Sequence, residues 1–315
     1  MNIRYKKIAA AVGIFLAAAA VILLSIHPLT RLYRQIFHLP DENGMYSVGD
    51  HWLEEMPELN EKSVIQIASK MDKIQTDLLT DQNYCYYAVI PDKSWYVREE
   101  GYQTVDQEKL LEIVRQNLSG DFTEIDLSSV LNLDNYYRSD RHWRQETLQP
   151  VLDALGDKMD FSIRLSDFTA NTFSPFSGSY AEYLIRQKEE ENLVYLTNSS
   201  TDSAVSDNFQ HPEIHTVYDL EKLKTENSYD VYLSGVSPLI TIENPNLQNG
   251  RELVIFRDSF ASSLAPLLLE EYQTITLVDL RFLFSSALPD YLTFTDQDVL
   301  FLYSTWIVNN SSMLR

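Results

Sequence analysis

The first pattern in the chain is an uncharged, apolar run over residues 8–26, preceded by Arg4, Lys6 and Lys7. As a helix, this run would extend about 28 Å at about 1.5 Å per residue, close to the thickness of one hydrocarbon core. Basic residues on its amino-terminal side favour a cytoplasmic N-terminus. We therefore expect residues 1–27 to form a cytoplasmic tip and a single-pass cell-membrane anchor, with the main domain extracytoplasmic. A cleaved signal peptide is the alternative, although its apolar region is normally shorter.

Helical and strand-like patterns alternate after this segment. Residues 28–60 contain prolines, mixed charge and a turn-like Asp41-Glu42-Asn43-Gly44, which predict a stalk or an irregular connecting segment. Apolar positions at helical spacing predict helices over 63–79 and 108–118. Strands are predicted after these two helices, over 84–90 and 123–127. Later in the chain, strands are predicted over 252–256, 274–280 and 298–303, and a helical stretch that ends near 272 lies between the first two of these.

This alternation indicates the fold class of residues 61–315. Strands that alternate with helices imply right-handed crossovers and helices that cover a mainly parallel sheet, so we expect one α/β domain. Residues 160–240 are less regular and predict an inserted or peripheral α+β region, with strand candidates at 193–196 and 230–233.

Charge and cysteine content narrow the function classes. The formal net charge is −21, and residues 1–27 hold three cations and no acids, so the remainder carries −21 − 3 = −24. Nucleic acid is therefore an unfavourable partner. Cys85 is the single cysteine, which excludes an internal disulfide and a cysteine metal cage. A buried structural thiol is the expected state of Cys85.

The sharpest local signal is Asp258-Ser259, which follows the predicted strand 252–256 and precedes a helical stretch. In an open α/β sheet this is the carboxyl edge, where ligands bind. Backbone N–H groups at a helix start can face a developing oxyanion, which suits Ser259 to acyl chemistry if a base is present. The alternative is that Ser259 only caps the helix.

A base is suggested by Asp140 and His142. A carboxylate that accepts from one imidazole nitrogen leaves the other to face a hydroxyl, and residues two apart share a face in extended chain. A surface Asp-His pair beside a packed Trp143 is an equal alternative on spacing alone. A metal site with Asp140, His142 and Asp258 is disfavoured, because no second histidine lies at ligand spacing.

Taken together, these motifs carry a resemblance to a known family. The segments that carry it are residues 136–143, 258–260 and 278–282, together with 89–93 and 176–180. In order and spacing they resemble the DHHW family of exported bacterial proteins, which is similar to the SGNH-hydrolase-like domains of alginate O-acetyltransferases. The resemblance covers about residues 80–310 and implies an SGNH-hydrolase-like three-layer sandwich.

The resemblance also implies a catalytic set and a reaction. Ser259 would be the nucleophile, His142 the base and Asp140 its orienting acid, with Arg281 as a substrate-contacting cation. A salt bridge with one of the many acids is the alternative for Arg281. Trp143 and Tyr137 are further candidate substrate contacts, because their rings could stack on a sugar. The implied reaction is serine acyl transfer or ester hydrolysis, most simply O-acetylation of a cell-surface or exported glycan, with no cofactor and no metal. A membrane-bound acyl carrier protein would supply the acyl group. Two departures from the family pattern are Arg141, where the second residue of the name motif is histidine, and Arg257, where glycine often precedes Asp-Ser.

Two functions from other classes remain open on the sequence. One is a non-catalytic module that binds glycan or a partner through aromatic side chains. The rings that could line such a groove are Trp95, Tyr96, Tyr136, Tyr137 and Trp143. The other is an assembly factor for a membrane acyltransferase. A separation beyond about 6 Å between Ser259 Oγ and a His142 ring nitrogen would favour the binding module over the enzyme.

Overall fold

The centre of the molecule is a seven-stranded, mainly parallel sheet, as predicted. The structure is a computed structural model that describes residues 33, 34, 36–180 and 191–315. The strand order is β4-β3-β11-β9-β10-β8-β7, in which the neighbours from β4 to β10 are parallel and β8 is antiparallel to both of its neighbours. The strands are β3 (Cys85–Ile90), β4 (Thr123–Glu124), β7 (Val205–Asn208), β8 (Leu239–Glu243), β9 (Glu252–Arg257), β10 (Thr274–Val278) and β11 (Asp298–Ser304).

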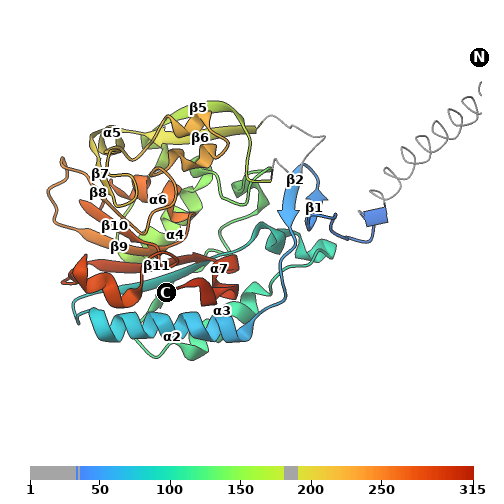
Figure 1. Ribbon diagram of the computed structural model, residues 1–315, viewed down its shortest axis with the longest axis horizontal. Helices are drawn as coiled ribbons and strands as arrows, with labels where there is room; N and C mark the ends of the chain where they lie inside the picture. Colours follow the sequence, from blue (N-terminus) through green and yellow to red (C-terminus); the bar gives the residue numbers. More distant parts are fainter. Residues whose placement is uncertain (1–32, 35, 181–190) are drawn as a thin grey trace, which may run out of the picture.

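Both faces of this sheet are buried by helices, which gives three layers (Figure 1). Along β3, Tyr86, Ala88 and Ile90 belong to one hydrophobic cluster, whereas the alternate residues belong to another. This follows from the two-residue period of a strand, and it explains why the buried strands are nearly continuous apolar runs. One face packs against α2 (Glu61–Leu78), α3 (Gln107–Asn117) and α7 (Thr305–Asn309), and the other against α4 (Gln149–Met159) and α6 (Ala261–Leu268).

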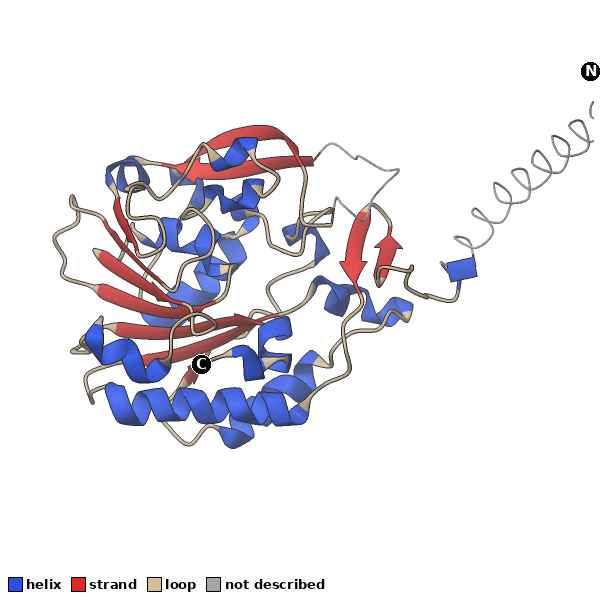
Figure 2. Cartoon of the chain, in the orientation of Figure 1, coloured by secondary structure: helices blue, strands red, loops and turns tan. Residues whose placement is uncertain are grey.

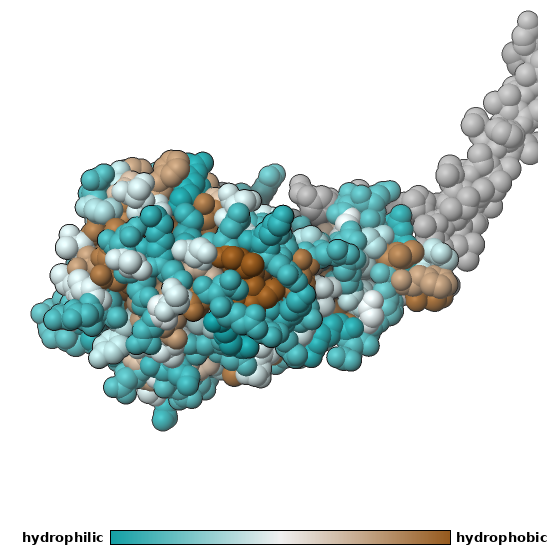
Figure 3. Space-filling view, turned by 90° about the horizontal axis from the view of Figure 1, so that it is seen from below, coloured by the Kyte–Doolittle hydropathy of each residue, from teal (hydrophilic) through white to brown (hydrophobic). Residues whose placement is uncertain are grey.

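The face shown in Figure 3, on the α2 side of the molecule, is largely hydrophilic, with a hydrophobic patch near its middle. Helix α2 places Val64, Ile67, Ala68, Met71 and Ile74 against the sheet at helical spacing. Its first turn is capped by the Asn60 side chain, which accepts from the Ser63 N–H at 3.2 Å.

The region from 160 to 240 is less regular, as expected, but one predicted strand in it is wrong. Strands β5 (Thr169–Phe176) and β6 (Glu191–Thr197) pair with each other outside the main sheet, and α5 (Ser199–Ser203) leads into β7. Ser228–Val231, where a strand was expected, is a 3-10 helix. The Tyr232 N–H bonds to the Tyr229 carbonyl, and positive φ angles at Leu233 and Ser234 then bend the chain away from an extended path.

The connecting segment 28–60 is more ordered than a stalk in its described part. It contains a hairpin of β1 (Met45–Val48) and β2 (His51–Glu54), which lies beside the main domain (Figure 2). Gly49, with φ of +59°, forms the tight turn between the two strands. The predicted anchor over residues 8–26 lies outside the described residues. Within the described ones, no helix combines the length and apolar character that a membrane span requires.

Candidate active site

Ser259 lies immediately after β9, between two parallel neighbours at the carboxyl edge of the sheet. Its hydroxyl does not cap α6: the capping position is Phe260, whose N–H donates to Asp258 Oδ1 at 3.1 Å. The other carboxylate oxygen of Asp258 accepts from the Ser304 N–H at the end of β11, at 2.8 Å. Asp258 therefore fixes the turn, and Ser259 Oγ is left for another partner, so the helix-cap interpretation is wrong.

That partner is His142. Its Nε2 lies 2.7 Å from Ser259 Oγ, and its Nδ1 lies 2.6 Å from Asp140 Oδ1. Asp140 is 2% exposed and His142 is 9% exposed, whereas Ser259 is half-buried. The three side chains form a continuous hydrogen-bonded chain from a buried carboxylate to an accessible hydroxyl. This is the relative placement that a serine nucleophile, its base and an orienting acid require.

The loop that carries Asp140 and His142 is held by a fully buried lysine. Lys93 follows β3, is 0% exposed, and donates from Nζ to the carbonyls of Tyr137 at 2.7 Å and Asp140 at 3.0 Å. It also lies 3.3 Å from the carbonyl of Arg138. Because the ammonium bonds to backbone oxygens, it positions the loop and leaves the Asp140 carboxylate free for His142.

The same loop is also fixed from the β5–β6 side. Glu191 accepts from the N–H groups of Arg138 at 2.6 Å and Ser139 at 3.0 Å. The Ser179 N–H donates to Asp140 Oδ2 at 2.7 Å. Gly178 makes this approach possible, since a Cβ there would lie 2.3 Å from the Ser139 carbonyl oxygen and 2.5 Å from Asp140 Cβ.

The His142 ring packs against two aromatic side chains. Tyr229 stacks on it with a centroid distance of 3.9 Å and an interplanar angle of 10°, and the Phe260 ring lies 4.8 Å away. The Tyr229 hydroxyl bonds to Ser263 Oγ at 2.9 Å, which fixes the stacked ring. Ring orientation is therefore set by packing as well as by Asp140.

Burial and hydrogen bonding have opposite effects on the pKa of Asp140. Burial alone would raise the pKa of Asp140, but the adjacent His142 and the N–H groups of His142 and Ser179 lower that pKa well below its ordinary value. The carboxylate thus stays ionised. Burial lowers the pKa of Lys93 to about 8, against the opposing influence of Asp140, Asp92 and Glu191.

A pocket opens over Ser259, with about 510 Å³ of empty space that includes some open solvent. It is lined by Glu54, Pro91, Asp92, Arg141, Asp258, Ser259, Phe260, Arg281, Ser304, Trp306 and Ile307. The lining mixes apolar surface with groups that donate and accept hydrogen bonds.

Of the three predicted substrate contacts, only Arg281 lines this pocket. Its guanidinium also pairs with Asp279, through Nε at 2.9 Å and Nη2 at 2.6 Å, so the salt bridge that was the alternative is present too. The predictions for Trp143 and Tyr137 are wrong, because both side chains are 0% exposed.

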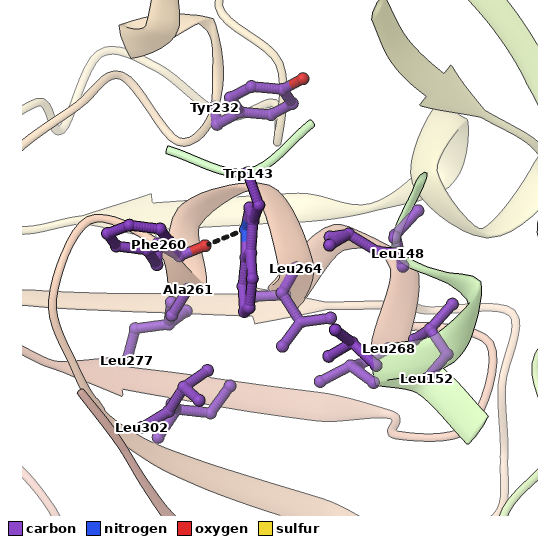
Figure 4. Close-up of a cluster of buried hydrophobic side chains, with 14 of the residues drawn as sticks. Trp143, Leu148, Leu152, Tyr232, Phe260, Ala261, Leu264, Leu268, Leu277 and Leu302 are labelled. Carbon is purple, nitrogen blue, oxygen red and sulfur yellow. Dashed lines mark hydrogen bonds between the residues drawn. The ribbon is translucent and has the colours of Figure 1, made fainter. Parts of the chain in front are cut away.

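Each of these two rings has a place in the interior. The Trp143 indole N–H donates to the Phe260 carbonyl at 3.1 Å, within the cluster shown in Figure 4. Tyr137 packs its ring on Phe176. The aromatic groove of the binding-module hypothesis is contradicted for four of its five rings, since Trp95 and Tyr136 are buried as well, whereas Tyr96 is half-buried.

The two departures from the family pattern have clear structural places. Arg141 Nη2 contacts Glu54 at 2.8 Å, away from His142. Arg257 is fully buried, and its Nη1 donates to Ser262 Oγ at 3.0 Å, so its side chain lies within the protein rather than in the pocket lining.

Sequence reasoning missed several residues that line the site or hold its side chains in place. Tyr229 lies in the irregular region, and no local pattern distinguishes a ring that stacks on histidine from an ordinary core tyrosine. Lys93 and Gly178 belong to segments that supported the resemblance, but nothing in the sequence showed that they hold the Asp140 loop. Glu54 was assigned to the stalk.

The fold and site together define a three-layer α/β domain with a serine-histidine-aspartate centre at the carboxyl edge of its sheet. No family model matches the chain, and no curated protein matches it in sequence. Among solved structures, a DHHW family protein from Eubacterium siraeum is 18% identical, with a TM-score of 0.70 over 87% of this chain and 94% of that one. Bacillus cereus PatB1 is 19% identical, with a TM-score of 0.65 over 86% and 97%.

A third similar structure is the O-acetyltransferase domain of Pseudomonas putida AlgJ. It is 11% identical, with a TM-score of 0.50 over 84% of this chain and 92% of that one. The expected resemblance to a DHHW family protein and to an O-acetyltransferase domain is thereby confirmed at the level of the fold.

Proposed function

We propose that this protein is a serine acyltransferase or esterase that acts on a glycan, with O-acetyl transfer as its principal reaction. One observation carries the proposal: His142 bridges Asp140 and Ser259 by hydrogen bonds of 2.6 and 2.7 Å, and Ser259 lines an open pocket. The similarity in fold to the O-acetyltransferase domain of AlgJ supports the choice of acyl group.

In the proposed reaction, Ser259 Oγ attacks the carbonyl carbon of an acyl ester while His142 Nε2 takes its proton. The tetrahedral intermediate collapses, the ester oxygen leaves with that proton, and the acyl group remains on Ser259. A glycan hydroxyl then loses its proton to His142 and attacks the acyl-serine, which restores the free serine. Asp140 holds the imidazole tautomer and stabilises the imidazolium in both halves.

The cellular setting of the proposal comes from the sequence. The apolar run 8–26 after three cations supports a single-pass anchor with the domain outside the cytoplasm. A membrane-bound acyl carrier protein would then deliver the acyl group. Deleting residues 1–27 should release the protein from the membrane fraction. A truncated chain that still sediments with membranes would argue against the anchor.

The test of the reaction is mass measurement of an acyl adduct after incubation with an activated acetyl ester. We expect one adduct on the wild-type protein and none on Ser259→Ala. The matched control is Ser312→Ala, which removes an exposed serine outside the pocket lining and should leave the adduct unchanged. An adduct on Ser259→Ala, at the wild-type rate, would exclude Ser259 as the nucleophile.

A further inference from the structure

One wall of the pocket comes from the β1–β2 hairpin rather than from the α/β domain. Glu54, the last residue of β2, lines the pocket together with Ser259. The hairpin is held against the Asp140 loop, because the Trp52 N–H donates to the Arg138 carbonyl at 2.9 Å. Arg138 Nη1 also contacts Asp50 Oδ2 at 3.1 Å. Glu54 therefore has a fixed place in the site.

The charges that line the pocket are unbalanced toward the negative side. In the lining itself, the carboxylates are Glu54, Asp92 and Asp258, and the cations are Arg141 and Arg281. The buried cations Lys93 and Arg257 interact with Asp92 and Asp258 but do not line the pocket, so a ligand cannot contact them. Both guanidiniums already have a carboxylate partner, Glu54 for Arg141 at 2.8 Å and the buried Asp279 for Arg281 at 2.6 Å. Within the described lining, neither arginine offers an uncompensated positive charge to a ligand.

The rest of the protein adds to this field. After residue 27 the formal charge is −24, from −21 for the chain less the three cations of the first segment. A field of this sign lowers the local concentration of polyanions and raises the free energy of placing a carboxylate in the pocket.

We infer that Glu54 is a specificity-determining residue and that the acceptor is an uncharged, hydroxyl-rich glycan rather than a polyuronate. This inference rests on the proposed function and names the class of its acceptor. Sugar hydroxyls both donate and accept, so they can bond to the paired groups of Glu54 and Arg141. A uronate carboxylate would instead lie near Glu54 and Asp92 without a free cation. Trp306, half-buried in the same lining, offers an apolar ring for a sugar face.

The test compares two hexasaccharides, neutral xylohexaose and anionic hexagalacturonate, binding to the full chain with Ser259→Ala. Isothermal titration calorimetry at low salt gives both dissociation constants without turnover. We expect xylohexaose to bind more tightly by about tenfold or more. Hexagalacturonate binding as tightly as xylohexaose, or neither sugar binding, would overturn the inference.

The role of Glu54 is isolated by adding Glu54→Gln to the same protein. The change removes a carboxylate and releases Arg141. The ratio of the two dissociation constants, hexagalacturonate over xylohexaose, should therefore fall about fivefold. Glu55→Gln is the matched control, because Glu55 is exposed and does not line the pocket. An unchanged preference in Glu54→Gln would exclude Glu54 as a specificity determinant.

These outcomes separate the inference from the reaction on which it rests. If the activated ester labels the wild-type protein but hexagalacturonate is the preferred ligand, only the acceptor class is wrong. If the ester fails to label Ser259, the reaction is wrong, and the binding ratio still decides whether Glu54 selects against anions.

Discussion

Replacing Lys93 by methionine tests how the Asp140 loop is positioned. Methionine has a similar length, so the change removes the ammonium without opening a large cavity. It deprives the carbonyls of Tyr137 and Asp140 of the Lys93 donor, whereas the Arg138 carbonyl keeps the Trp52 N–H at 2.9 Å. The loop then lacks its main attachment to the end of β3.

The structure gives the size of the effect. Two buried carbonyls without a donor cost about 2–6 kcal/mol in total. Against this, the variant no longer buries an ammonium whose pKa is lowered from 10.5 to about 8, a relief of about 3 kcal/mol. The two contributions leave the free energy of unfolding at pH 7 between a gain of about 1 kcal/mol and a loss of about 3 kcal/mol, so the acylation rate is the more sensitive measure of the positioning role. The rate of Ser259 acylation should fall by about 100-fold, because a shift of about 1 Å in the base is enough for this.

The pH dependence has a definite sign. Between the folded pKa of Lys93 near 8 and the unfolded value near 10.5, the unfolded chain binds more protons than the folded protein. The wild-type advantage over Lys93→Met should therefore grow as pH rises above 8, approaching about 1.4 kcal/mol per pH unit.

Urea unfolding of both proteins between pH 7 and 9.5 measures the stability difference, and ester labelling gives the acylation rate. Lys109→Met is the matched control, because the Lys109 ammonium forms an exposed ion pair with Glu61 rather than a buried contact. Equal stability and equal acylation of Lys93→Met and wild type would refute the positioning role. A stability advantage that shrinks with rising pH would show that the ammonium is not penalised by burial.

Two further substitutions test the other supports of the site. Asp140→Asn should reduce the acylation rate by about 10³–10⁴-fold with the fold retained by circular dichroism, since the amide cannot hold His142 in the required tautomer. A rate within about tenfold of wild type would contradict that role. Gly178→Ala should displace the Asp140 loop, because its Cβ would lie 2.3 Å from the Ser139 carbonyl oxygen. Its acylation rate should fall. Gly250→Ala meets nothing within 4 Å of its Cβ but strains the backbone at a φ of +70°, so it should cost some stability and still acylate at the wild-type rate.

The sheet was predictable because its buried strands carry a strong local signal. β9 is apolar at consecutive positions, as a strand covered on both faces must be, and it was found to within one residue. The turn after it placed Ser259 at the carboxyl edge without knowledge of the fold. The strand expected at 230–233 failed, because local turns and positive φ angles there override a β-branched sequence.

The site was predictable only where chemistry is encoded at short range. Asp140 and His142 are two residues apart, so their contact could be inferred. The strand-turn-helix pattern singled out Ser259, and the resemblance supplied its role as nucleophile. The direction in which Trp143 and Tyr137 point could not be inferred, since an aromatic beside a catalytic residue can face the pocket or the core. Here the indole N–H of Trp143 has acceptors inside the protein, at Phe260 and Ser263, which makes burial favourable.

The arrangement of charge behind the site has a physical reason. A lysine bonded directly to the Asp140 carboxylate would compete with His142 for its oxygens and would reduce the stabilisation of the imidazolium. Lys93 instead bonds to the carbonyls of the loop, and among the described residues the donors to the carboxylate are N–H groups of His142 and Ser179. Positioning and charge stabilisation are thus assigned to different groups. For this reason, loss of Lys93 should move the base, whereas loss of Asp140 should change its tautomer, and both variants should slow the acylation of Ser259.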